Sequence, residues 1–150
     1  MKRFEKILLP VDFSDYSEVA CDYAITLAKT FHSTLQVLHV INEPVDLRGF
    51  YVPHLSFEQL ETEIETGASK MLDAFCQEHL KDFGAFETLI VTGVPYEEII
   101  RAATEKESSL IVIGTHGRTG LDHLIFGSTA ERVVRSAPCP VMTIRLPVSV

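Results

Sequence analysis

The chain alternates short, continuous apolar runs with longer segments in which apolar residues recur every three or four positions. Apolar runs of about four to eight residues are typical of strands buried on both faces, as in parallel sheets. The run Leu110–Ile113 is the most apolar, which favours a central place in the sheet. The pattern predicts five strands: Lys6–Val11, Thr34–Ile41, Phe86–Val91, Leu110–Ile113 and Val141–Ile144.

The segments between these runs carry apolar residues at helical spacing and predict four helices. Three of them open with the spacing of a capping box, in which two side chains satisfy the first amides of a helix. The paired residues are Asp15 and Glu18, Ser56 and Gln59, and Ser128 and Glu131. We expect helices from Ser14 or Asp15 to Phe31, from Ser56 through Phe83 to a stop at Gly84, from Pro95, and from Ser128 to Ser136.

Five strands separated by four helices require right-handed crossovers, and crossovers of this kind join parallel strands. We therefore expect one α/β domain over residues 1–150, a doubly wound, Rossmann-like, five-stranded parallel sheet with helices on both faces. Residues 42–55 show no apolar period and hold two prolines and a glycine, so they are predicted to be a long loop. Loops of this length often serve as lids or binding elements.

Composition narrows the class of protein. With 46% hydrophobic and 23% charged residues, 150 residues are typical of a globular domain. A net charge of −8 disfavours nucleic acid as a partner, and no apolar run approaches the length of a membrane span. No apolar leader opens the chain, and three scattered cysteines without a Cys-x-x-Cys pair suit reduced thiols. We expect a cytoplasmic protein without a structural zinc site.

The C-terminal third differs from the rest in charge. Residues 108–150 hold four Arg and two acidic residues, so this part has a net charge of +2 within an acidic chain. This distribution fits a small anionic ligand, or it is a chance imbalance among six charges.

A glycine pattern follows the fourth predicted strand. Two residues separate Gly114 from Gly117, nine separate Gly117 from Gly127, and Ser128 and Thr129 come next. Glycines let backbone amides approach phosphate oxygens closely, and a helix N-terminus favours anions. Arg118 offers a further charged contact, whereas simple turn chemistry explains the glycines without any ligand. The patterns G-x-x-x-x-G-K-[ST] and G-x-G-x-x-G after the first strand are both absent.

Polar side chains near this pattern have competing interpretations. Asp12 ends the first strand and is predicted to accept hydrogen bonds from a ligand, or else to serve the N-terminus of the first helix. Ser128 is a candidate both for phosphate contact and for an N-cap. His116 and His123 are candidates for phosphate contact, although histidines in exposed loops more often have no such role.

The chain resembles the universal stress protein family of the UspA-like, ATP-binding type. The resemblance rests on Gly114, Gly117, Gly127 and Ser128, on the opening segment 7–12, on Leu38–Ile41 and on Ala137–Val141. It implies an adenine nucleotide α-hydrolase-like fold that binds ATP, or AMP or cAMP, with Mg²⁺. It also implies that Pro10, Val11, Val40 and Ile113 line the adenine and that Asp12 accepts hydrogen bonds from the ribose or the adenine. Gly114 would contact the ribose side, and Gly117, Gly127, Ser128 and Thr129 would hold phosphates.

The function expected from this resemblance is that of a nucleotide-dependent stress-response regulator whose ATP occupancy changes its conformation or its partners. No catalytic residue and no metal ligand is assigned. Two alternatives stay open: a slow ATPase or phosphotransferase, and a protein-interaction module that binds no nucleotide. The resemblance also implies a homodimer formed through the last strand, because Val141–Arg145 would otherwise leave a sheet edge unprotected.

Overall fold

A computed structural model describes residues 3–42, 56–117 and 125–147 and shows one parallel sheet in the order β3-β2-β1-β4-β5. The strands are β1 (Lys6–Pro10), β2 (Thr34–Ile41), β3 (Phe86–Thr92), β4 (Leu110–Gly114) and β5 (Val141–Ile144). The chain starts in the middle of the sheet, builds outward through β2 and β3, and returns to add β4 and β5 on the other side. The direction in which successive strands are added to the sheet therefore reverses between β1 and β4.

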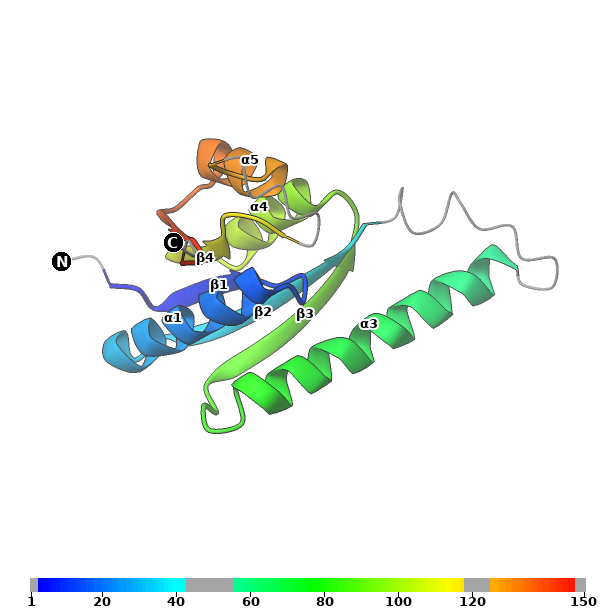
Figure 1. The fold of residues 1–150 in the computed structure, drawn as a ribbon, viewed down its shortest axis with the longest axis horizontal. Coiled ribbons are helices and arrows are strands. Elements are labelled where there is room, and N and C mark those ends of the chain that lie inside the picture. Colours follow the sequence, from blue (N-terminus) through cyan, green and yellow to red (C-terminus); the bar gives the residue numbers. More distant parts are fainter. Residues whose placement is uncertain (1–2, 43–55, 118–124, 148–150) are drawn as a thin grey trace.

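Helices cover both faces of this sheet (Figure 1). On one face lie α1 (Asp15–Phe31) and α3 (Phe57–His79), and on the other lie α4 (Pro95–Glu105) and α5 (Ser128–Ser136). The prediction of a five-stranded parallel α/β sheet with helices on both faces is confirmed. The capping box of Ser56 and Gln59 is also confirmed, at the start of α3.

Three local predictions are wrong. The N-cap of α1 is Ser14, which accepts from the Ser17 amide, so Asp15 and Glu18 form no capping box. The cause is Asp12, which binds the amide and hydroxyl of Ser14 and holds this residue just outside the helix.

The other two errors concern α3 and β4. The helix α3 ends at His79 rather than near Gly84, because Leu80 and Phe83 turn back into the core. The central strand is β1 and not β4. Since β4 also has a strand on each side and helices on both faces, it is as apolar as a central strand.

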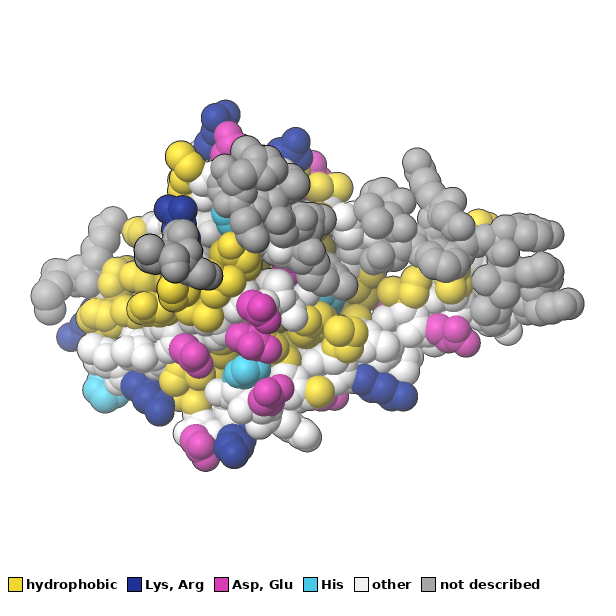
Figure 2. All heavy atoms as spheres, viewed as in Figure 1, with side chains coloured by type: hydrophobic (Ala, Val, Ile, Leu, Met, Phe, Trp, Pro, Cys, Tyr) yellow, Lys and Arg dark blue, Asp and Glu magenta, His cyan; other side chains and the backbone are white. Residues whose placement is uncertain are grey.

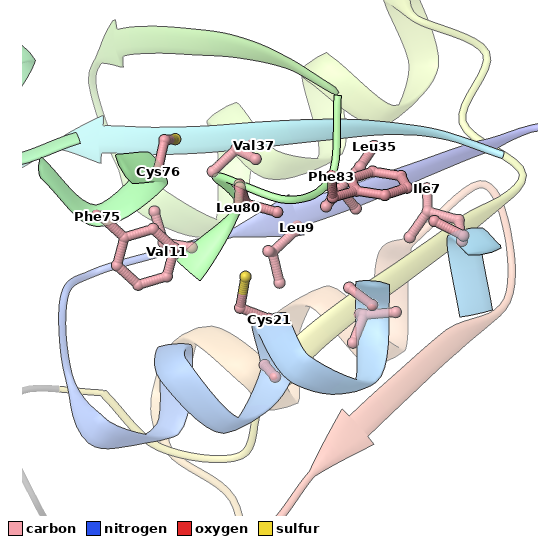
Figure 3. Close-up of a cluster of buried hydrophobic side chains, with 14 of the residues drawn as sticks. Ile7, Leu9, Val11, Cys21, Leu35, Val37, Phe75, Cys76, Leu80 and Phe83 are labelled. Atoms are coloured by element: carbon pink, nitrogen blue, oxygen red, sulfur yellow. The ribbon is translucent and has the colours of Figure 1, made fainter. Parts of the chain in front are cut away.

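The strand β1 supplies side chains to two separate apolar clusters, because successive residues of a strand point to opposite faces. Ile7 and Leu9 belong to the larger cluster, which packs against α1 and α3 and also holds Val11, the residue after the strand (Figure 3). Leu8 belongs to the smaller cluster, which packs against α4 and α5. In the larger cluster burial raises the pKa of the Cys21 thiol to about 12 and that of the Cys76 thiol to about 11, so neither is a reactive thiolate near neutral pH.

The helix α3 is packed over only part of its length. Its buried residues are Ala68, Leu72, Phe75 and Cys76, all in the second half, and the first half extends past the sheet in Figure 1. Figure 2 shows acidic side chains gathered over α1 and α3 on the face in view. None of the helices within the described ranges combines the length and the apolar character that crossing a membrane requires.

The burial of β1 predicts the effect of Leu9→Ala. Leu9 is fully buried in the central strand, so its loss leaves a cavity and should lower the free energy of unfolding by about 2–5 kcal/mol. The matched control is Met71→Ala in α3, where the side chain is 49% exposed and the expected loss is below about 1 kcal/mol. Urea unfolding followed by circular dichroism measures both, and equal losses in the two variants would contradict this packing.

Candidate functional site

The carboxyl ends of β1 and β4 meet at the point where the strand order reverses, which is where open α/β sheets bind ligands. Asp12 follows β1, and Gly117 lies three residues after the end of β4. A Cβ built on Gly117 would overlap Oδ2 of Asp12. The fold therefore brings together the carboxylate and the glycine segment that the sequence predicts to act together.

The two oxygens of the Asp12 carboxylate lie in different surroundings. Oδ1 accepts from the Ser14 amide at 3.0 Å, from the Ser14 hydroxyl at 2.5 Å and from the Ser17 hydroxyl at 2.8 Å. Oδ2 faces Gly117. One interpretation of Asp12, service to the N-terminus of α1, is thus confirmed for Oδ1. The same bonds orient the second oxygen toward the segment after β4.

Phe13 holds this turn in an unusual backbone conformation. Its φ of +66° is left-handed, which costs a residue with a Cβ about 1–2 kcal/mol. The ring is packed against His39 at 4.5 Å and Phe75 at 6.1 Å between centroids, and Nδ1 of His39 lies 2.8 Å from the Val11 carbonyl oxygen. Sequence reasoning missed Phe13. The available signal was a bulky residue between a strand-ending Asp and a helix-capping Ser.

At the start of α5 the structure corrects the expected cap. Gly127 is the N-cap and Ser128 is the first helical residue, so the interpretation of Ser128 as N-cap is wrong. The Gly127 amide donates to the Thr115 carbonyl at 2.7 Å, which ties the helix start to the end of β4 and commits this amide to an internal bond.

The next amides of α5 have no such bond among the described residues. The N-cap is Gly127, which has no side chain with which to cap the helix. Within the three described ranges, no acceptor is recorded for the amides of Ser128, Thr129 and Ala130. The first amides of a helix have no partner inside it, and with the helix dipole they favour an anion. These three groups are the backbone donors that a phosphate could use.

Gly114 has a packing role that sequence reasoning did not identify. A Cβ at this position would lie 2.7 Å from Cβ of Tyr16, so any larger residue would push the start of α1 away from β4. The glycine thereby lets α1 approach the site.

His116 is buried, contrary to the expectation of an exposed loop histidine, with 8% of its surface accessible. Its Nδ1 lies 3.0 Å from the Thr115 hydroxyl, and its ring lies 5.2 Å from that of Tyr16 between centroids.

The four residues assigned to adenine all lie at this edge of the sheet, but on different faces. Val11 belongs to the cluster under α1 and α3, whereas Val40 and Ile113 belong to the cluster under α4 and α5. Pro10 ends β1 between them and is buried. Arg118 and His123 lie outside the described residues, as do residues 43–55 of the predicted loop. Within the described part of the chain, no three His, Cys, Asp or Glu side chains are grouped to hold a metal ion.

Comparison with known proteins gives a consistent result. The model of the universal stress protein family matches residues 3–145. The chain is 35% identical over 147 residues to the universal stress protein YxiE of Bacillus subtilis, covering 95% of this chain and 99% of that protein. Its structure is similar to that of MJ0577 from Methanocaldococcus jannaschii, with a TM-score of 0.84 and 26% identity over 99% of this chain and 100% of that one.

Two more distant structures contain adenine nucleotides. One is a universal stress protein from Archaeoglobus fulgidus in complex with dAMP, 23% identical with a TM-score of 0.64, and coverage of 95% and 98% of the two chains. The other is a universal stress protein in complex with cAMP, 19% identical with a TM-score of 0.68 and the same coverage. At these identities the likeness establishes the fold alone.

The bonds of Asp12 predict that its replacement weakens the start of α1. Asp12→Ala removes an acceptor shared by three donors and should lower the free energy of unfolding by about 1–3 kcal/mol. Asp12→Asn keeps a side-chain oxygen at the position of Oδ1 and should lose less than half as much. Urea denaturation of both variants tests this. Equal stability of Asp12→Ala and the wild type would show that Oδ1 does not stabilise the turn.

Proposed function

We propose, from the premise that this chain belongs to the universal stress protein family, that it binds an adenine nucleotide between the ends of β1 and β4. Occupancy of this site would change the conformation of the protein or its partners and so regulate a stress response. The cytoplasm is the proposed location.

One observation carries the proposal: the uncapped N-terminus of α5 and the carboxylate of Asp12 flank the same short segment, Thr115–Gly117. Gly127 at the start of α5 bonds to Thr115, and Asp12 faces Gly117. One end of this site is therefore rich in amide donors and the other end carries a negative charge. A nucleotide has the matching polarity, since its phosphates accept hydrogen bonds and its ribose hydroxyls donate them.

This polarity orients the ligand. The amides of Ser128 and Thr129 would hold phosphate oxygens, and Asp12 would accept from the ribose. The contact contributed by one helix end is modest, about 0.3–1 kcal/mol, so several amides must act together. Gly117 lets the backbone pass close to the carboxylate, and Gly127 positions α5 through Thr115.

The remaining assignments follow from the family. Pro10, Val11, Val40 and Ile113 would contact the adenine, Gly114 the ribose side, and Arg118 the phosphates. ATP is the proposed ligand, and AMP or cAMP would use the same donors. Mg²⁺ would be held by the phosphates and water, since this cation is commonly bound through substrate phosphates. The complexes of the distant fold neighbours with dAMP and cAMP support the adenine class.

No hydrolytic step is part of the proposal. Hydrolysis needs a group that positions or deprotonates the attacking water near the terminal phosphate. Of the candidates in the glycine segment, His116 is buried, and Asp122 and His123 lie outside the described residues.

Nucleotide binding is tested by titration calorimetry with Mg-ATP on the wild type and on Gly117→Val. The valine would collide with Asp12 and displace either the carboxylate or the segment, so the Kd should rise at least about tenfold. The matched control is Gly84→Val, because a Cβ at Gly84 meets nothing within 4 Å, and its Kd should equal that of the wild type. Equal heats from Gly117→Val and the wild type would contradict the proposed site.

We also propose that two copies of the chain pair through β5, which lies at the edge of the sheet. The bonds from Ile111 to the Pro140 carbonyl and from Thr115 to the Ile144 carbonyl fix which residues of β5 face β4. Because the ladder of a parallel pair alternates, the amide of Thr143 points to the outer side.

This register predicts that Thr143→Pro disrupts pairing between copies while keeping the β4–β5 ladder. Light scattering should give a dimer mass for the wild type and for the control Thr143→Ala, and a monomer mass for Thr143→Pro. Unchanged circular dichroism would show that the sheet persists. A dimer of Thr143→Pro would place the interface elsewhere.

A further inference from the structure

A buried nitrogen of His116 has no hydrogen-bond partner in the part of the chain that the structure describes. The side chain is 8% exposed, its Nδ1 lies 3.0 Å from the Thr115 hydroxyl, and its Nε2 is covered and makes no bond within the described residues. Leaving a buried polar group without a partner costs about 1–3 kcal/mol. Native structures rarely contain such a group unless a ligand, an ion or an ordered water completes it.

The position of the ring identifies what would complete it. His116 lies between the first turn of α1, where Tyr16 contacts its ring, and the start of α5. Its Cδ2, the ring carbon bonded to Nε2, lies 3.9 Å from where a Cβ on Gly127 would be. The ring carbon next to the unpartnered nitrogen therefore lies close to Gly127, the N-cap of α5.

We propose that His116 is a phosphate-binding side chain of this site and donates its Nε2 proton to a phosphate oxygen held at the start of α5. This inference rests on the proposed function and extends it by adding one side-chain donor to the backbone amides that would hold the phosphate. Because Nε2 is buried, its contact with a phosphate requires a local shift of the ring or its surroundings when the ligand binds.

Thr115 sets the tautomer that this role requires. A phosphate oxygen is only an acceptor, so Nε2 must carry the proton and Nδ1 must accept. The Thr115 hydroxyl is placed to donate to Nδ1, and Thr115 is itself buried and fixed by its backbone bonds to Ile144 and Gly127. A bond between this donor and a charged oxygen, formed away from water, belongs to the stronger class of hydrogen bonds.

The ribose end of the ligand, which would lie near Asp12, does not compete with the phosphate for His116. Asp12 faces Gly117 at the other end of the short segment, and a carboxylate there disfavours a second anion. The donor of His116 and the amides of α5 therefore favour the same group, the phosphate nearest to α5.

The test compares AMP with adenosine, which differ only in the phosphate, by titration of the wild type, His116→Phe and His116→Gln. Phenylalanine keeps a ring against Tyr16 and removes the donor, so the Kd for AMP should rise about tenfold or more. The Kd for adenosine should change less than about twofold. Glutamine places an amide N–H near the position of Nε2 and should restore part of the affinity for AMP.

A second measurement needs no variant and applies even if His116→Phe fails to fold. In the wild type with ¹⁵N-labelled histidine, AMP should shift the Nε2 resonance of His116, while saturating adenosine should leave it in place. The same resonance pattern with both ligands would overturn the inference.

The possible failures are distinguishable. If His116→Phe binds AMP as tightly as the wild type, His116 is no phosphate ligand, while the proposed nucleotide site stands. If the wild type binds neither AMP nor ATP, both the site and the role of His116 are wrong.

Discussion

The Asp12 carboxylate lies between two parts of the molecule that form the site: it is bonded to the start of α1, and it faces the segment after β4. Oδ1 fixes the start of α1 through Ser14 and Ser17, and Oδ2 faces Gly117 in the segment after β4. A single side chain therefore caps the start of α1 and lies against the segment that follows the neighbouring strand. A longer or shorter side chain at this position would lose either the cap or the close approach.

The backbone strain at Phe13 shows how the core supports this arrangement. A left-handed residue persists only where its surroundings hold it, and here the ring is packed against His39 of β2 and Phe75 of α3. The second half of α3 is thus part of the support for the Asp12 turn. In addition, Nε2 of its last residue, His79, lies 3.8 Å from Oε1 of Glu18 in α1.

The architecture was predictable because a parallel sheet covered on both faces requires continuous apolar runs, and these are visible in the sequence. The glycine spacing and Asp12 could be placed at one edge from strand order alone. Details that depend on contacts between distant segments could not be predicted. Nothing local distinguishes Ser14 from Asp15 as the N-cap until Asp12 is seen to bind Ser14. The burial of His116 likewise depends on Tyr16 and Gly127, of which one lies 100 positions earlier in the sequence and the other 11 positions later.

The neighbouring strands that bear the site, β1 and β4, are 103 positions apart in a chain of 150 residues. Lys6 of β1 bonds to Ser109, 103 positions later, and Ile7 is in register with Leu110. Contacts between residues so far apart in the sequence form late in folding, because closing a long loop costs entropy before any contact is gained. During synthesis the first three strands can associate long before β4 leaves the ribosome. Asp12 and the glycine segment after β4 come together only when β4 has joined the sheet. A ligand bound there would select the finished fold over every partly assembled one, so the concentration of that ligand would act directly on the population of intact protein.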